Sequence, residues 1–183
     1  MDLRRLGASD LKLAPLVLGG NVFGWTADRE ASFALLDAFV DAGGTMIDTA
    51  DVYSQGESEE IVGKALQGGR RNTVVLATKL HNPMGTDINS RGNSRRWIMR
   101  AVEDSLRRLQ TDHIDLYQVH RPDPATDIDE TLGALSDLVR QGKIRYAGSS
   151  TFPAHQIVEA QWTAERRGRE RFVTEQPPYS ILA

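Results

Sequence analysis

The strongest constraint on the fold is a regular alternation of short apolar segments with amphipathic ones. Apolar, β-rich segments start near residues 16, 45, 73, 114, 144 and 172. The segments between them carry helical patterns, such as residues 28–42, where Phe33, Leu36 and Val40 share one face. Strands that alternate with helices in this way are typical of a parallel sheet with right-handed crossovers.

The length of the repeat favours one parallel architecture. Steps of roughly 30 residues match one unit of a (β/α)₈ TIM barrel, which takes about 250 residues in all. A doubly wound sheet is the rival, but the first strand is not followed by the G-x-G-x-x-G fingerprint of that fold. Apolar pieces around Gly7-Ala8-Ser9-Asp10 add an N-terminal β-hairpin. Ser58 and Ser94 are predicted to be the N-caps of the two helices that follow them.

Six units account for the 183 residues. We therefore predict an α/β fold in one domain, residues 1–183, that forms an incomplete TIM barrel of about six βα units with an N-terminal β-hairpin. The last two βα units and the C-terminal loop would be missing, so we expect a C-terminally truncated barrel. Its first and last strands would then be open edges, and we expect residues 1–183 alone to be marginally stable, prone to self-association and barely active.

Composition excludes several classes of function. A net charge of -3 and the lack of a basic stripe give no indication of binding to nucleic acid or to an anionic membrane surface. The absence of cysteine excludes disulfides and thiolate metal sites. No stretch reaches the ~20 apolar residues that span a bilayer, and residues 1–5 do not resemble a signal peptide. These features predict a soluble, cytoplasmic protein without a metal site, and they leave the oligomeric state undetermined.

Polar residues close three successive predicted strands. Asp48, Lys79 and His120 each stand at the end of one strand, and Tyr53 lies in the loop after Asp48. Taken alone, each residue has an ordinary structural explanation. Asp48 could cap a turn, and the charged head of Lys79 could reach solvent. His120 could cap the next helix, and Tyr53 could be a packing aromatic. The carboxyl ends of barrel strands share the face that holds active sites, so the four side chains are expected to converge.

The chemistry of these four side chains is complementary. A free tyrosine hydroxyl titrates at about pH 10, which makes it a poor acid at neutral pH. A lysine cation nearby stabilises the phenolate, and an aspartate can hold that lysine in place. A histidine at the rim can hydrogen-bond a carbonyl oxygen. Together such groups would protonate an oxygen while a second agent supplies an electron pair.

Several longer segments carry a family resemblance. They are residues 44–53 (GTMIDTADVY), 57–66 (ESEEIVGKAL), the strand that ends in Lys79, and residues 115–120 (DLYQVH), 142–150 (GKIRYAGSS) and 176–180 (QPPYS). In this order they resemble the aldo-keto reductases over the whole chain. That resemblance implies a (β/α)₈ barrel that transfers a hydride from NADPH, or less often NADH, to the carbonyl of an aldehyde or ketone.

The resemblance also implies residue roles. The catalytic tetrad of the family falls on Asp48, Tyr53, Lys79 and His120. Tyr53 would be the proton donor, Lys79 the cation that strengthens it as an acid, Asp48 the partner of Lys79, and His120 the residue that orients the substrate carbonyl. Trp25 would lie at the substrate side together with His120.

Further positions match the cofactor site of the family. Ser150 and Gln176 match two residues that hold the nicotinamide carboxamide, and Thr151 stands where the family has asparagine. A hydroxyl has one polar group where an amide has two, so one hydrogen bond to the carboxamide is in question at Thr151. Gly20 and Asp48 would border the nicotinamide ribose. The family binds the 2′-phosphate beyond the residues present here, so the sequence decides neither between NADP and NAD nor on the substrate.

Three functions remain open from the sequence. The first is an NAD(P)-dependent aldo-keto reductase that acts on a small carbonyl substrate. The second is a regulatory or sensor subunit that binds nicotinamide, as some members of the family do on ion channels. The third is an inactive fragment of a reductase. The intact tetrad favours the enzyme, because a protein that only binds cofactor has no need of Tyr53 or His120.

Overall fold

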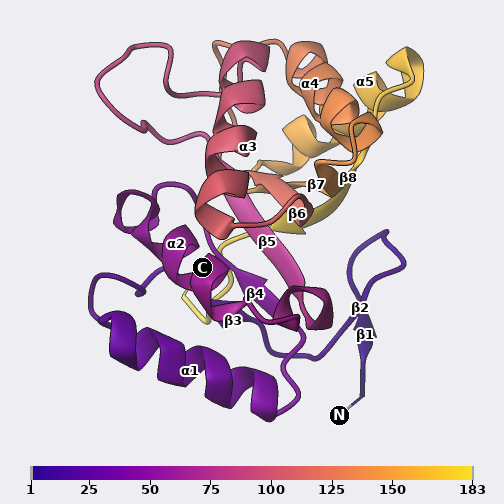
Figure 1. Cartoon of the computed structure of the whole chain (residues 1–183). Coiled ribbons are helices and arrows are strands. Elements are labelled where there is room, and N and C mark those ends of the chain that lie inside the picture. Colours follow the sequence, from indigo (N-terminus) through magenta and orange to yellow (C-terminus); the bar gives the residue numbers. More distant parts are fainter. Residues whose placement is uncertain (1, 183) are drawn as a thin grey trace.

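A six-stranded parallel sheet forms the centre of the molecule (Figure 1). The computed structural model describes residues 2–182. The strands follow one another in chain order: β3 (Leu18–Gly19), β4 (Met46–Asp48), β5 (Val75–Leu80), β6 (Ile114–Val119), β7 (Ile144–Ser150) and β8 (Phe172–Gln176). Every neighbouring pair is parallel. The predicted incomplete TIM barrel of six βα units is confirmed.

Five helices cover the outer face of the curled sheet (Figure 1). They are α1 (Arg29–Asp41), α2 (Glu57–Ala65), α3 (Arg95–Leu109), α4 (Ile128–Arg140) and α5 (Ala154–Arg167). Two short 3₁₀ helices, η1 (Tyr53–Gly56) and η2 (Arg70–Thr73), precede and follow α2 in the chain. Each helix packs against the next one in the chain. The core lies between helices and strands, where Ile47, Leu76, Ile98, Val102 and Leu132 are fully buried.

The predicted N-terminal hairpin is also confirmed. Strands β1 (Arg4–Arg5) and β2 (Lys12–Leu13) pair antiparallel, apart from the main sheet. Leu13 is buried against Met46 and Leu116 in a small second core, and the Ala14 amide donates to Thr45 Oγ1 just before β4. The hairpin thus packs at the amino-terminal end of the strands and leaves the opposite end free for a site.

Helix starts illustrate where local patterns succeed and fail. Ser94 caps α3 as predicted, since its Oγ accepts from the Trp97 amide. The sequence also favours Ser58 as the cap of the second helix, and this is wrong: α2 begins at Glu57, after Gly56 with φ 97°. Glycine tolerates this left-handed conformation, so the helix starts earlier and the Ser58 hydroxyl donates instead to the Gly20 carbonyl.

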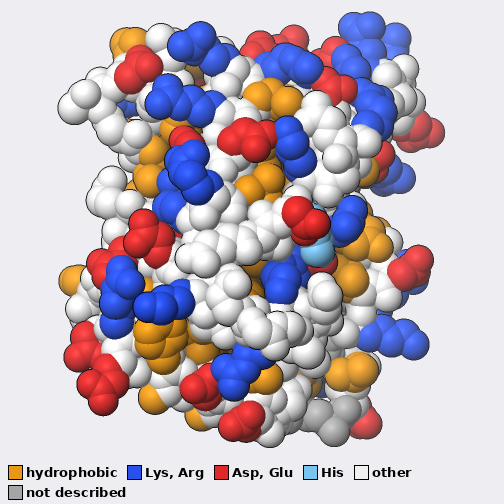
Figure 2. All heavy atoms as spheres, viewed as in Figure 1, with side chains coloured by type: hydrophobic (Ala, Val, Ile, Leu, Met, Phe, Trp, Pro, Cys, Tyr) orange, Lys and Arg blue, Asp and Glu red, His pale blue; other side chains and the backbone are white. Residues whose placement is uncertain are grey.

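The sheet is open at both ends within residues 2–182, where β3 pairs only with β4 and β8 only with β7. Charges of both signs are interspersed over the face shown in Figure 2, so they largely compensate one another there. No helix in the described part of the chain combines the length and the apolar character that crossing a membrane requires.

Candidate active site

The carboxyl edge of the sheet gathers the four predicted catalytic residues. Asp48 is the last residue of β4, and Lys79 is the penultimate residue of β5. His120 directly follows β6, and Tyr53 begins η1 in the loop after β4. Parallel neighbours in one register carry these positions to the same edge.

Asp48 and Lys79 form a buried ion pair. Lys79 Nζ lies 2.6 Å from Asp48 Oδ2 and donates a second hydrogen bond to the Thr49 carbonyl at 3.0 Å. The side chain of Lys79 is 2% exposed and that of Asp48 is 10% exposed. Two acceptors therefore fix the ammonium group in a site that excludes most water.

Tyr53 lies between the ammonium of Lys79 and the ring of His120. Lys79 Nζ is 5.2 Å from the centroid of the Tyr53 ring, within the range of a cation–π contact. The rings of Tyr53 and His120 meet edge to face, with centroids 5.9 Å apart and an angle of 84° between their planes. The tetrad predicted from sequence is thus brought together around one point.

The backbone after Tyr53 is held in an unusual conformation. Ser54 and Gln55 both adopt left-handed torsions, with φ of 50° and 55°. The Ser54 hydroxyl donates to the Phe23 carbonyl at 2.8 Å, which ties this turn to the loop after β3. Such strain persists only where surrounding contacts impose it, and it often accompanies functional sites.

His120 is neutral at physiological pH. Burial, together with the cations of Lys79 and Arg121 and with His81, lowers the pKa of its imidazole from 6.5 to about 4. Its backbone amide donates to the Leu80 carbonyl at 2.9 Å. A neutral imidazole has one N–H donor, which suits it to hydrogen-bond an uncharged oxygen.

Sequence reasoning missed Gln118. This residue is buried on β6, two positions before His120, and its Nε2 donates to Asp48 Oδ1 at 3.1 Å. It also approaches Gln176 Oε1 at 3.4 Å. The available signal was an amide inside an otherwise apolar strand, because a buried amide must find polar partners.

The predicted cofactor residues lie around Asp48 as well. Gln176 Nε2 donates to Asp48 Oδ2 at 3.2 Å, and the Gly20 amide donates to the Asp48 carbonyl at 2.8 Å. Ser150 Oγ donates to the Gln176 carbonyl at 3.0 Å. Thr151 has φ 59° and donates from its hydroxyl to the His120 carbonyl at 3.3 Å. The ends of β3, β4, β7 and β8 therefore supply one continuous polar rim.

Trp25 lies over a shallow cavity beside Tyr53. The cavity holds about 400 Å³ and is also lined by Asn21, Gly24 and Glu57. Trp25 is 74% exposed, so its indole is available to an incoming molecule. A small molecule that rests against this indole would have Tyr53 within the same hollow.

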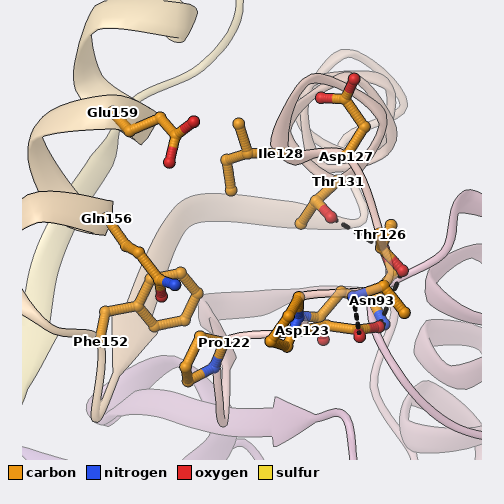
Figure 3. Close-up of a pocket in the computed structure, with 12 residues that line it drawn as sticks. Asn93, Pro122, Asp123, Thr126, Asp127, Ile128, Thr131, Phe152, Gln156 and Glu159 are labelled. Carbon is orange, nitrogen blue, oxygen red and sulfur yellow. Dashed lines mark hydrogen bonds between the residues drawn. The ribbon is translucent and has the colours of Figure 1, made fainter.

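A separate cavity of about 470 Å³ opens on the loops after β6 and β7 (Figure 3). Two of its acidic side chains are used locally: Asp123 accepts from the Asn93 amide and the Thr126 hydroxyl, and Asp127 caps α4. Ile128 and Phe152 supply apolar lining. None of Asp48, Tyr53, Lys79 and His120 lines this cavity.

Comparison with known proteins gives the family of this chain. The family model described as "Aldo/keto reductase family" matches residues 15–183. The oxidoreductase YrpG of Bacillus subtilis is 42% identical, and the match covers 100% of this chain and 59% of YrpG. Aldo-keto reductase dtxS3 of Metarhizium robertsii is 36% identical, with coverage of 100% and 57%.

A rice (Oryza sativa subsp. japonica) protein described as "Probable voltage-gated potassium channel subunit beta" is 38% identical, with coverage of 100% of this chain and 56% of the rice protein. The chain therefore spans less than three fifths of the length of these relatives. With a family match over nearly all of its residues, this chain belongs to the aldo/keto reductase family.

Proposed function

We propose that the protein of this chain is an NAD(P)H-dependent reductase of aldehydes and ketones, with Tyr53 as the proton donor. The observation that carries the proposal is the position of Tyr53 between the Lys79 ammonium and the neutral His120 ring. A phenol beside a fixed cation can release a proton to a carbonyl oxygen as negative charge develops there.

The other tetrad residues support that proton transfer. The cation of Lys79 stabilises the phenolate that Tyr53 leaves behind, and Asp48 prevents the ammonium from turning away. His120 donates an N–H to the carbonyl oxygen and so holds it toward the tyrosine hydroxyl. Burial of the ion pair keeps water from screening these charges.

The rim around Asp48 fits a nicotinamide. A carboxamide needs both a donor and an acceptor, and Gln176 and Ser150 retain such capacity beyond their bonds to Asp48 and to the backbone. Thr151 and Gly20 complete this rim. When bound, the reduced nicotinamide supplies the hydride for the carbonyl carbon. NADP is the proposed cofactor by family membership, with NAD as the alternative.

The hollow beside Trp25 indicates a small substrate with a flat or apolar body. An aryl or short aliphatic aldehyde could pack its apolar part on the exposed indole and point its oxygen at Tyr53. The pocket is shallow, so the parts of a substrate far from its carbonyl group would make few contacts with the protein. Many different aldehydes should therefore be substrates.

A second candidate function is that of a nicotinamide-binding regulatory subunit. The similarity to the rice channel subunit supports it. The two functions differ in whether Tyr53 is needed. A sensor would bind the cofactor with or without the tyrosine hydroxyl, whereas a reductase would lose turnover.

The deciding experiment measures NADPH and NADH oxidation with a panel of small aldehydes. The chain is assayed beside a chimera that carries the downstream segment of the B. subtilis relative. We expect aldehyde-dependent oxidation that falls at least ~100-fold in Tyr53→Phe, while cofactor binding changes little. Turnover that is absent from both proteins would contradict a reductase, and near-normal turnover in Tyr53→Phe would remove its assigned role.

A further inference from the structure

Asn82 occupies a defined position against the imidazole of His120. It lies in the loop after β5, and its Nδ2 is 3.1 Å from His120 Nδ1. An amide nitrogen carries two hydrogens and no free lone pair, so it can only donate. In this contact His120 Nδ1 therefore accepts and carries no proton.

The loop that presents Asn82 is held at several points. The Gly92 amide donates to the His81 carbonyl at 2.7 Å, and His81 Nδ1 lies 2.9 Å from Asn93 Oδ1. Asn93 Nδ2 in turn donates to the Arg121 carbonyl at 3.0 Å. The loop after β5 is thus fastened to the residue that follows His120, which keeps Asn82 and the imidazole at a fixed separation.

His120 carries a single proton, and its surroundings determine which ring nitrogen holds it. Burial opposes a second proton on the imidazole, and so do the Lys79 ammonium from β5, Arg121 on its own loop and His81 from the loop after β5. The other titratable group packed against the ring is Tyr53. A ring with a single proton and an accepting Nδ1 must carry that proton on Nε2.

From these contacts we propose that Asn82 is a positioning residue that fixes His120 in the tautomer with Nε2 protonated. The donor of the imidazole is then directed away from the loop, on the side of the ring opposite the Asn82 contact. In the other tautomer two N–H groups would face each other across 3.1 Å, and His120 would present a lone pair, which cannot bond a carbonyl oxygen.

His81 shows the opposite arrangement and serves as an internal reference. The amide of Asn93 is oriented by its donation to Arg121, so its oxygen faces His81 and must accept. His81 therefore keeps a proton on Nδ1. The chain has four histidines, so imidazole signals can be assigned one at a time by His→Gln variants.

The test is ¹⁵N NMR of the full chain with labelled histidine, without cofactor or substrate. The catalytic meaning of the His120 tautomer rests on the proposed reductase function, but the NMR signal reports the tautomer whether or not the protein is a reductase. A wrong tautomer can therefore be distinguished from a wrong function. We expect His120 to show a protonated Nε2 and a bare Nδ1 from pH 8 to pH 5. A protonated Nδ1 in the unaltered chain would overturn the proposal.

Substitutions at Asn82 separate positioning from packing. In Asn82→Leu we expect His120 to become a mixture of tautomers while His81 is unchanged. Asn82→Asp has nearly the same shape but can only accept, so it should draw a proton onto His120 Nδ1. The matched control is Asn89→Leu, an exposed position in the same loop, which should leave both histidines as they were. An identical His120 spectrum in all three variants would overturn the proposal.

Activity gives a second measure once carbonyl reduction is established. Loss of one neutral hydrogen bond predicts a fall of about 3- to 10-fold in kcat/KM for Asn82→Leu. In Asn82→Asp the Nε2 donor survives only while the ring is an imidazolium, so kcat/KM should fall as pH rises. A flat pH profile in Asn82→Asp would count against control of the tautomer by this residue.

Discussion

Lys79 Nζ and Asp48 Oδ2 are 2.6 Å apart at the centre of the strand ends, and neither charge has appreciable access to water. Removal of one charge should therefore cost more than removal of both. Lys79→Met is expected to lower the free energy of unfolding by about 3–5 kcal/mol, because Asp48 remains buried without its cation. Adding Asp48→Asn should recover part of that loss.

The measurement is a double-mutant cycle, in which urea unfolding gives the free energy of unfolding of the unaltered chain, the two single variants and the double variant. If the effects of the single variants simply add, the two groups are not coupled. Such a result would mean that the cation of Lys79 is compensated elsewhere, for example by the Thr49 carbonyl.

Gln118 is the second support of Asp48. Gln118→Met keeps the length of the side chain and removes the donor to Asp48 Oδ1, which lies 3.1 Å from Nε2. A hydrogen bond to a charged acceptor contributes about 1.5–3 kcal/mol, so the free energy of unfolding should fall by that amount. The control is Gln141→Met at an exposed position, where no measurable change is expected. Equal effects at both positions would show that Gln118 does not hold Asp48.

The order of the βα units could be predicted from sequence because apolar periodicity is a local property. The tetrad could be placed because strand ends in a parallel barrel share one edge. The contact between Gln118 and Asp48 could not be predicted, because the two residues are 70 positions apart in the sequence and the contact depends on which side chains point inward. The contact of Asn82 with His120 depends on the path of a loop, which periodicity does not specify.

The wrong prediction of Ser58 as a helix cap has a local cause. Ser58 precedes acidic residues and has the typical character of an N-cap, yet Gly56 adopts φ 97° and starts α2 earlier. Only glycine takes this conformation without strain, so the choice between the two starts depends on the backbone after Tyr53. The same turn places Ser54 and Gln55 in left-handed torsions, which sequence patterns did not indicate.

Thr151 is expected to be strained. It has φ 59°, a region that β-branched residues avoid and asparagine tolerates. Thr151→Asn should therefore raise the free energy of unfolding by about 1 kcal/mol and the melting temperature by about 2–4 °C. If the correspondence with the family holds at this position, cofactor affinity should be kept or improved.

Thr151→Val provides the matched control for that gain. Valine keeps the branched Cβ and loses only the hydroxyl, whose hydrogen bond to the His120 carbonyl is long at 3.3 Å. It should leave the melting temperature nearly unchanged or slightly lower. A gain in Thr151→Val as large as that in Thr151→Asn would assign the effect to the hydroxyl rather than to the backbone.

Asp51 carries a buried carboxyl group without a hydrogen-bond partner for either oxygen within residues 2–182. Burial, together with the negative charge of Glu59, raises its pKa from 3.8 to about 8. In the unfolded chain the group loses its proton near pH 4, but in the folded chain only near pH 8. Between these values the folded state holds more protons, so stability should fall as pH rises from about 4 to about 8.

Asp51→Asn tests that dependence because asparagine stays neutral at every pH. Urea unfolding at pH 8 should show the variant to be more stable than the unaltered chain, by on the order of 2–5 kcal/mol. At pH 5 the gain in stability should be smaller. The carboxyl is then protonated in the folded chain, and keeping it protonated costs little free energy because pH 5 lies close to its pKa in the unfolded chain. Asp41→Asn, at an exposed position at the end of α1, should show no such trend. A gain of equal size at both pH values would mean that Asp51 is ionised in the folded chain throughout this range.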